Sequence, residues 1–191
     1  MKQLAVKWPV WNFDPTRRMI AVSLPFMERH TIMILYFLRH AHAEDGYDKS
    51  DELRALTANG HQQAAATGEL LKSIGLKLAA LYTSPRLRAT QTAEAIGNAL
   101  GITPQVREEL NIGFNVTRLN KLVGDASLSD SIMVVGHEPT LSQTIREITG
   151  GRVEMKKCGL ARVDVMVRQP LNGELVWLLP PRLVNGLVED L

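Results

Sequence analysis

The chain has 191 residues, of which 45% are hydrophobic, and its 22 basic and 20 acidic residues leave a formal net charge of only +2. This length and hydrophobic content suit one domain with a sizeable core, while the near balance of charge provides no broad basic surface for nucleic acid or membranes. Because Cys158 is the single cysteine and no apolar stretch approaches the roughly 20 residues of a membrane span, we expect a cytoplasmic protein with an inert core thiol.

The first 32 residues show no clean helical or strand period and mix Trp8 and Trp11 with prolines and scattered charge. We expect residues 1–32 to form a poorly ordered N-terminal extension that is dispensable. Met33 stands directly before the first predicted strand, where the domain could begin by itself. A second form of this hypothesis is that Met33 is the true first residue and that the preceding 32 residues are a misplaced start. The alternative is an amphipathic flap whose two tryptophans cover a hydrophobic face.

Residues 34–38 form an unbroken apolar run, and Arg39 and His40 follow it directly. A short run with β-branched and aromatic members is typical of a strand that is buried on both faces. Ligands bind outside the carboxyl ends of strands in open α/β sheets, so Arg39 and His40 are a candidate site. A surface arginine beside a structural histidine is the alternative that this stretch leaves open.

Further short apolar runs alternate with segments rich in helix-forming residues. The predicted strands are 78–82, 105–108, 131–135, 160–167 and 174–179, and the predicted helices are 57–75, 85–100, 117–123 and 140–148. Thr57 is a suitable N-cap, Ser84 and Pro85 are expected as N-cap and first helical residue, and Gly101 as a helix stop. Strands that alternate with helices favour a parallel sheet with helices on its faces.

Three segments outside the predicted helices and strands are expected to form a loop, a turn and a tail. The polar segment 43–56 is expected to run as a loop over the mouth of the candidate site. Asn172 and Gly173 indicate a hairpin turn between the last two strands, which would form an antiparallel edge. We expect the domain to cover residues 33–181 and residues 182–191 to be a surface tail.

Basic side chains follow three of the predicted strands. These are Arg39 and His40 after the first, Arg86 and Arg88 after the second, and His137 after the strand at 131–135. Parallel strands bring such ends together, and helix N-termini add the positive ends of their dipoles. Guanidinium and imidazole groups beside free N–H groups favour a phosphoryl group as ligand. Metal ligation by the histidines is the weaker alternative, because no carboxylate or cysteine pattern accompanies them.

Four motifs in this order resemble those of the histidine phosphatase (phosphoglycerate mutase-like) superfamily. They are Leu38-Arg39-His40-Ala41, Leu56-Thr57-Ala58-Asn59-Gly60, Thr83-Ser84-Pro85-Arg86-Leu87-Arg88-Ala89-Thr90-Gln91-Thr92-Ala93 and Val135-Gly136-His137-Glu138-Pro139. The short form, without large insertions, is most similar to the SixA-type phosphohistidine phosphatases. The resemblance implies a three-layer α/β fold with a mostly parallel sheet, flanking helices and an antiparallel edge. One departure is Ala41, where the superfamily usually has glycine.

The resemblance also implies roles for individual residues. His40 would attack phosphorus and form a phosphohistidine intermediate, while Arg39, Arg88 and His137 would hold the phosphoryl oxygens. Neither a metal nor a cofactor is implied, because the guanidinium groups neutralise the phosphate. Arg86 falls where the motif varies and is expected to face solvent or the rim.

Further contacts with the substrate are less well marked. His42 is a candidate at the rim, although a surface histidine is the simpler interpretation, and Glu44, Glu109 and Glu138 are conceivable proton donors. Glu109 is the preferred one of these and the one expected to touch the substrate. None of the three lies in a motif that marks it as an acid.

The lack of a marked acid favours phosphohistidine as substrate, since its leaving imidazole has a conjugate acid with a pKa of about 6.5. We therefore expect a metal-independent, monomeric phosphatase that removes phosphate from histidine on a phosphorelay-type protein, without nucleic-acid or membrane partners. The alternatives are a small-molecule phosphomonoester phosphatase of the same superfamily and a phosphate-binding module without turnover.

Overall fold

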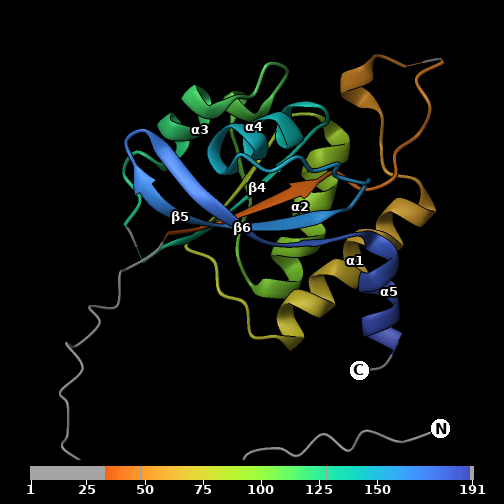
Figure 1. Ribbon diagram of the computed structural model, residues 1–191. Helices are drawn as coiled ribbons and strands as arrows, with labels where there is room; N and C mark the ends of the chain where they lie inside the picture. The colour runs from red at the N-terminus through yellow and green to blue at the C-terminus, as the bar shows by residue number, and fades with distance from the viewer. Residues whose placement is uncertain (1–32, 48, 128, 190–191) are drawn as a thin grey trace, which may run out of the picture. The chain divides into compact units, whose positions relative to one another are not determined.

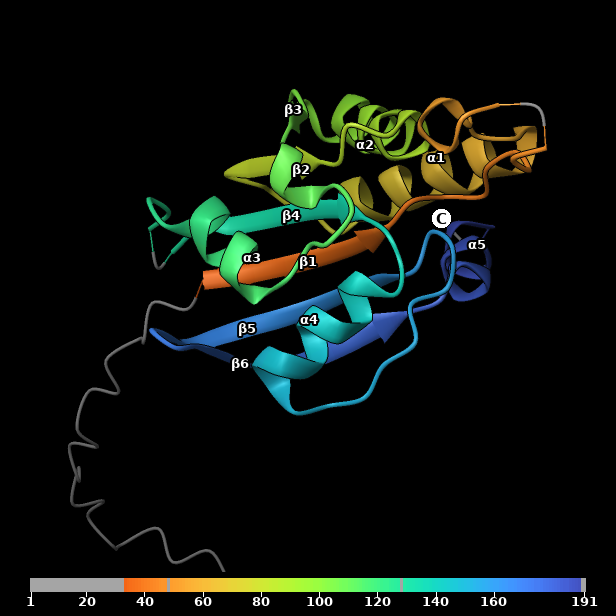
Figure 2. The same ribbon diagram turned by 90° about the horizontal axis from the view of Figure 1, so that it is seen from above.

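Six strands form one sheet in the order β3-β2-β4-β1-β5-β6. The computed structural model describes residues 33–47, 49–127 and 129–189, so the predicted extension and its flap alternative lie outside the described residues. The strands are β1 (Met33–Arg39), β2 (Ala80–Thr83), β3 (Gln105–Val106), β4 (Ser131–Gly136), β5 (Leu160–Arg168) and β6 (Leu171–Leu179). β1 to β4 are parallel, whereas β5 runs antiparallel to both β1 and β6. The predicted mostly parallel sheet with an antiparallel edge is confirmed (Figure 2).

Helices cover both faces of this sheet. They are α1 (Ala58–Ser73), α2 (Leu87–Leu100), α3 (Val116–Val123), α4 (Thr140–Thr149) and α5 (Pro181–Glu189), with short 3-10 turns η1 (Asp51–Leu53) and η2 (Glu108–Leu110). In Figure 1, α3 and α4 lie above the sheet and α1 and α5 below it. This is the three-layer arrangement that the sequence predicted.

The central strand β1 supplies both halves of the hydrophobic core. Leu35 and Phe37 pack with the side chains of α3 and α4, whereas Tyr36 and Leu38 pack with those of α1 and α2. Successive side chains of a strand point to opposite faces, so an unbroken apolar run is what a strand between two helical layers requires. This burial makes β1 the fixed support for the residues that follow it.

The strand register aligns the carboxyl ends of β1, β2 and β4. Val135 of β4 lies beside Leu38 of β1 on one side and Thr83 of β2 on the other. The residues immediately after these positions therefore emerge at the same edge of the sheet. This alignment is the structural basis of the site described below.

The predicted capping residues are correct at the start of α1 and at the end of α2, but not at the start of α2. Thr57 accepts a hydrogen bond from the Gly60 N–H, as expected of an N-cap, and Gly101 ends α2 with a left-handed φ of 70°. The predicted cap of α2 was wrong, because that helix begins at Leu87 and Ser84 makes no cap. Ser84 is fully buried and its backbone N–H donates to the Val135 carbonyl, so it still belongs to the sheet edge.

The hairpin prediction was correct in its strands and wrong in its turn. Gln169 and Pro170 lie between β5 and β6, and Gly173 lies within β6 opposite Val165. The Asp164 carbonyl oxygen lies 2.5 Å from where a Cβ on Gly173 would be. The glycine therefore permits close backbone approach inside the hairpin and takes no part in the turn.

The tail predicted at 182–191 was also wrong, because residues 181–189 form the helix α5. Pro181 is the first residue of this helix, where its missing N–H has no helical partner to lose. Val184 is fully buried, and the helix packs against α1. Within the residues that the structure describes, no helix is long and apolar enough to span a bilayer.

Cys158 is a core residue, as predicted. Its side chain is fully buried, and burial raises the pKa of its thiol to about 11. The Sγ atom lies 3.3 Å from the Thr67 hydroxyl, and the Cys158 N–H donates to the His40 carbonyl. A buried thiol with a raised pKa is a poor nucleophile, so its contribution is to packing.

Candidate active site

Two imidazoles and a guanidinium group meet at the carboxyl edge of the sheet. The ring centroids of His40 and His137 are 5.1 Å apart, and Nε of Arg88 donates to Nε2 of His40 at 3.2 Å. His40 follows β1, His137 follows β4, and Arg88 lies in the first turn of α2 after β2. Residues that are 97 positions apart in the sequence, such as His40 and His137, are therefore brought together by the parallel register.

The contacts of His40 determine which of its ring nitrogens carries the proton. Nδ1 lies 2.8 Å from the Ala41 carbonyl oxygen, which can only accept, so Nδ1 is the protonated nitrogen. Nε2 is therefore unprotonated, and its single lone pair accepts from Arg88. Burial, followed by the positive charges of Arg88, Arg39 and Lys157, lowers the pKa of His40 to about 3. The ring is thus a neutral nucleophile at neutral pH.

His137 is held through its other ring nitrogen. Its Nε2 lies 2.8 Å from the hydroxyl of the buried Ser84, while its Nδ1 is buried without a hydrogen-bond partner among the described residues. Burial, together with the nearby His40 and the arginines, lowers the pKa of His137 to about 2. A buried nitrogen that lacks a partner is costly unless a ligand pairs with it.

Arg39 is anchored in a similar way. Nη1 donates to the Met155 carbonyl at 2.8 Å, and the buried Nε has no partner among the described residues. Burial lowers the pKa of the Arg39 guanidinium, and its positive charge lowers the pKa of both His40 and His137. Arg39 therefore adds a second cation and a second unpaired donor to the cluster.

Alanine at position 41 fits the backbone without strain. Among the described residues, Cys158 is the non-glycine residue with a positive φ, so Ala41 does not need a conformation that favours glycine. Its N–H donates to the hydroxyl of Thr92 at 3.1 Å, and its side chain is fully buried. The departure from the usual glycine therefore leaves the geometry of this turn intact.

A cavity of about 210 Å³ lies beside the cluster. Arg86, Arg88, His137 and Glu138 all line it, as does Asp51 from the 43–56 segment. The expectation that this segment runs over the site is therefore confirmed. A cavity of this size, lined by buried cations, suits a small anionic group.

Arg86 differs from its expected position at the rim. Only 6% of the residue is exposed, and Nε donates to Oδ1 of Asn111 at 3.1 Å. Its guanidinium group also forms an ion pair with Asp51. The physical cause is that α2 begins at Leu87, two residues after the predicted start at Pro85, so Arg86 precedes the helix and its guanidinium group reaches Asp51 of the covering segment.

The three glutamates considered as proton donors lie in different places. Glu138 lines the cavity and is half-buried, and burial raises the pKa of its carboxyl group. Its Oε1 accepts from the Ser142 hydroxyl at 2.9 Å. Glu44 instead pairs with Lys49 at 2.7 Å.

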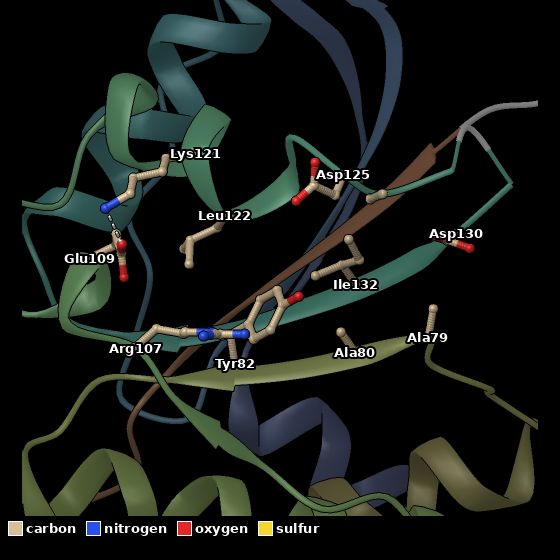
Figure 3. Close-up of a pocket in the computed structure, with 11 residues that line it drawn as sticks. Ala79, Ala80, Tyr82, Arg107, Glu109, Lys121, Leu122, Asp125, Asp130 and Ile132 are labelled. Carbon is tan, nitrogen blue, oxygen red and sulfur yellow. Dashed lines mark ion pairs between the residues drawn. The ribbon is translucent and has the colours of Figure 1, made fainter.

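The preference for Glu109 was wrong. Its carboxylate pairs with Lys121 at 2.7 Å, and this contact lowers its pKa. Figure 3 shows the pair in a separate pocket, where Arg107 lies over the ring of Tyr82. Glu109 in the η2 turn thus pairs with a side chain of α3 and is not among the residues that line the cavity beside His137.

His42 holds the covering segment and makes no hydrogen bond to the cluster in the described residues. Its Nδ1 lies 2.9 Å from the hydroxyl of Thr57, and its N–H donates to the side chain of Gln63. His42 is partly buried and hydrogen-bonded, so it is not the solvent-exposed histidine of the simpler interpretation, and its contact with substrate stays a prediction.

Comparisons with known proteins agree with the fold and the motifs. A family model described as the histidine phosphatase superfamily (branch 1) matches residues 35–111. An uncharacterized protein of Picosynechococcus is 34% identical over 163 residues, covering 78% of this chain and 98% of the relative. The phosphohistidine phosphatase SixA of Escherichia coli is 27% identical over 156 residues, covering 78% of this chain and 94% of the relative. A solved structure of the protein histidine phosphatase SixA with tungstate superimposes with a TM-score of 0.70 and 26% identity, over 80% of this chain and 99% of that one.

Proposed function

This chain belongs to the histidine phosphatase superfamily and is a phosphatase, and from that premise we propose that it removes phosphate from phosphohistidine on a protein. The observation that carries the proposal is the neutral His40 ring, whose Nε2 faces Arg88 beside an anion-sized cavity. The similarity to a phosphohistidine phosphatase supports the choice of substrate.

The proposed reaction has two displacements at phosphorus. Nε2 of His40 forms a bond to phosphorus while the bond from phosphorus to the substrate imidazole breaks, and that imidazole leaves with a proton on its second nitrogen. Nδ1 of His40 keeps its proton throughout and donates a hydrogen bond to the Ala41 carbonyl. Water then attacks the phosphohistidine, and phosphate leaves as His40 is restored.

Arg39, Arg88 and His137 are proposed to bind the phosphoryl oxygens. The unpaired Nε of Arg39 and Nδ1 of His137 are the groups that a phosphoryl oxygen would satisfy. Negative charge spread over these oxygens would be stabilised by donors that are already in place. We propose that these guanidinium groups supply the positive charge without a metal. The cytoplasmic location, the monomeric state and the lack of a nucleic-acid or membrane partner stay predictions.

The buried contact of Ser84 provides one test of this assignment. Ser84→Ala removes the partner of Nε2 on His137, so we expect kcat to fall about tenfold with a phosphohistidine peptide. Ser73→Ala, at an exposed position of α1, is the control and should keep the kcat of the unchanged protein. An unchanged kcat in Ser84→Ala would show that His137 needs no support from this hydroxyl.

Hydrolysis of a small phosphate ester is the second candidate function, and the position of Glu138 favours it. An alkoxide leaving group needs a proton, and a half-buried carboxyl group with a raised pKa can provide one. Phosphohistidine needs this help far less. The non-catalytic alternative is set aside, because the family comparisons identify a phosphatase.

A substrate panel with Glu138→Gln separates the two functions. We expect the unchanged protein to turn over a phosphohistidine peptide faster than sugar or nucleotide phosphates, and Glu138→Gln to keep more than about a third of the peptide activity. Glutamine retains the acceptor for Ser142, so α4 should stay intact. Fast ester hydrolysis that falls about 10²-fold in Glu138→Gln, with an inert peptide, would establish the ester phosphatase instead.

A further inference from the structure

A carboxylate from the covering segment occupies the arginines of the candidate site. Oδ2 of Asp51 accepts from Nη2 of Arg88 at 3.1 Å, and the same oxygen forms an ion pair with Nη1 of Arg86. The backbone carbonyl of Asp51 accepts from Nη1 of Arg88 at 2.5 Å. Two guanidinium groups from the start of α2 thus converge on one oxygen atom.

All three nitrogens of the Arg88 guanidinium are engaged in this arrangement. Nε donates to the His40 ring, while Nη1 and Nη2 both donate to Asp51. Each Nη nitrogen of Arg88 thus directs one of its two N–H groups to Asp51, at the guanidinium that also contacts Nε2 of His40.

The burial of the two arginines explains why an anion is held there at all. Their side chains are each 7% exposed, whereas that of Asp51 is 47% exposed. Two adjacent buried cations repel one another and need a shared counter-charge. A carboxylate from a partly exposed surface segment can supply this charge without being part of the core.

We propose that Arg86 and Arg88 form one phosphoryl-binding pair in which oxygens of the substrate replace the Asp51 carboxylate. Arg86 is then a further substrate-binding residue, and Asp51 is an internal competitor that occupies the pair until substrate arrives. The inference rests on the proposed function only in taking the incoming anion to be the phosphoryl group of the substrate.

The surroundings of the pair allow this exchange. Asn111 holds Nε of Arg86 at 3.1 Å, so this guanidinium keeps an anchor when Asp51 leaves. Asp51 keeps a partner of its own, because Arg54 donates to its Oδ1 at 2.8 Å. A phosphoryl dianion carries more charge than a carboxylate and matches the same donors, which favours the replacement.

Binding of inorganic phosphate to the full chain tests the proposal without turnover. By titration calorimetry we expect Asp51→Asn to bind phosphate about tenfold more tightly, and Arg86→Gln about tenfold more weakly. Asp45→Asn, in the same segment, and Arg107→Gln, outside the site, make the same charge changes at exposed positions and should leave the affinity unchanged.

Two further measurements separate competition from structural support. If Asp51 merely positions the arginines, Asp51→Asn will bind phosphate more weakly, and this result or an unchanged affinity would overturn the proposal. Arg86→Lys, which keeps the charge, should fall between Arg86→Gln and the unchanged protein, and the gain from Asp51→Asn should shrink in an Arg86→Gln background.

The kinetic readout keeps this inference distinct from the choice of substrate. Asp51→Asn should lower KM more than it changes kcat for whichever phosphorylated substrate the panel identifies. If the panel identifies an ester and Asp51→Asn still binds phosphate more tightly, the exchange stands and the proposed substrate fails. If the peptide is the substrate and phosphate affinity does not rise, the exchange fails alone.

Discussion

His40→Ala is expected to lower kcat for a phosphohistidine peptide by roughly 10⁴- to 10⁶-fold, the range seen when a covalent nucleophile is removed. The physical reason is the loss of the neutral Nε2 that faces Arg88. The other members of the cluster still bind phosphate, but they cannot form a bond to phosphorus. Residual turnover would come from oriented water and stabilised oxygens.

Trapping of the intermediate provides the measurement for this variant. A substrate labelled with radioactive phosphate should transfer acid-labile label to the unchanged protein and none to His40→Ala. His61→Ala, at an exposed position of α1, is the matched control and should label normally. Label that persists in His40→Ala would place the nucleophile elsewhere.

Arg88→Lys is expected to lower kcat/KM by about 10²- to 10³-fold, although the charge is kept. Arg88 contacts Nε2 of His40 through Nε and presents two further nitrogens to the anion position. An ammonium group is a compact charge and cannot make these contacts together. We therefore expect His40 to be less well oriented and the phosphoryl oxygens to be less stabilised.

Steady-state kinetics and phosphate affinity together measure the effect of this change. We expect kcat to fall more than phosphate affinity, because part of the loss is in the orientation of the nucleophile. Arg146→Lys, on the exposed side of α4, should match the unchanged protein. A loss of less than tenfold in Arg88→Lys would mean that charge alone is sufficient at this position.

The apolar strands made much of the site predictable. The runs that became β1, β2 and β4 have few alternatives to a buried parallel sheet, and a basic residue follows each within three positions. Parallel register then requires the ends to coincide, which is why His40, Arg88 and His137 were expected together. Their proximity is a property of the structure, whereas their catalytic roles stay predictions.

Errors arose where a side chain's direction depends on packing beyond its own element. Arg86 was expected at the rim and is buried beside the cavity, whereas Glu109 was the preferred donor and pairs with Lys121 instead. Spacing along the chain does not show which carboxylate a turn directs inward. Ser84 was assigned to a helix cap, because a serine hydroxyl can hydrogen-bond either to the N–H groups at the start of a helix or to a histidine ring. Only the position of His137 decides between them.

The amino-acid sequence by itself determined the α/β class, the parallel core and the family, because these depend on local periodicity and on ordered motifs. The tertiary structure alone decided that α5 packs against α1, that Glu138 and Arg86 line the cavity, and that Asp51 occupies the arginines. The physical reason is that burial and charge pairing are set by distant residues: the shared counter-ion of Arg86 and Arg88 comes from a different segment, more than 30 positions away.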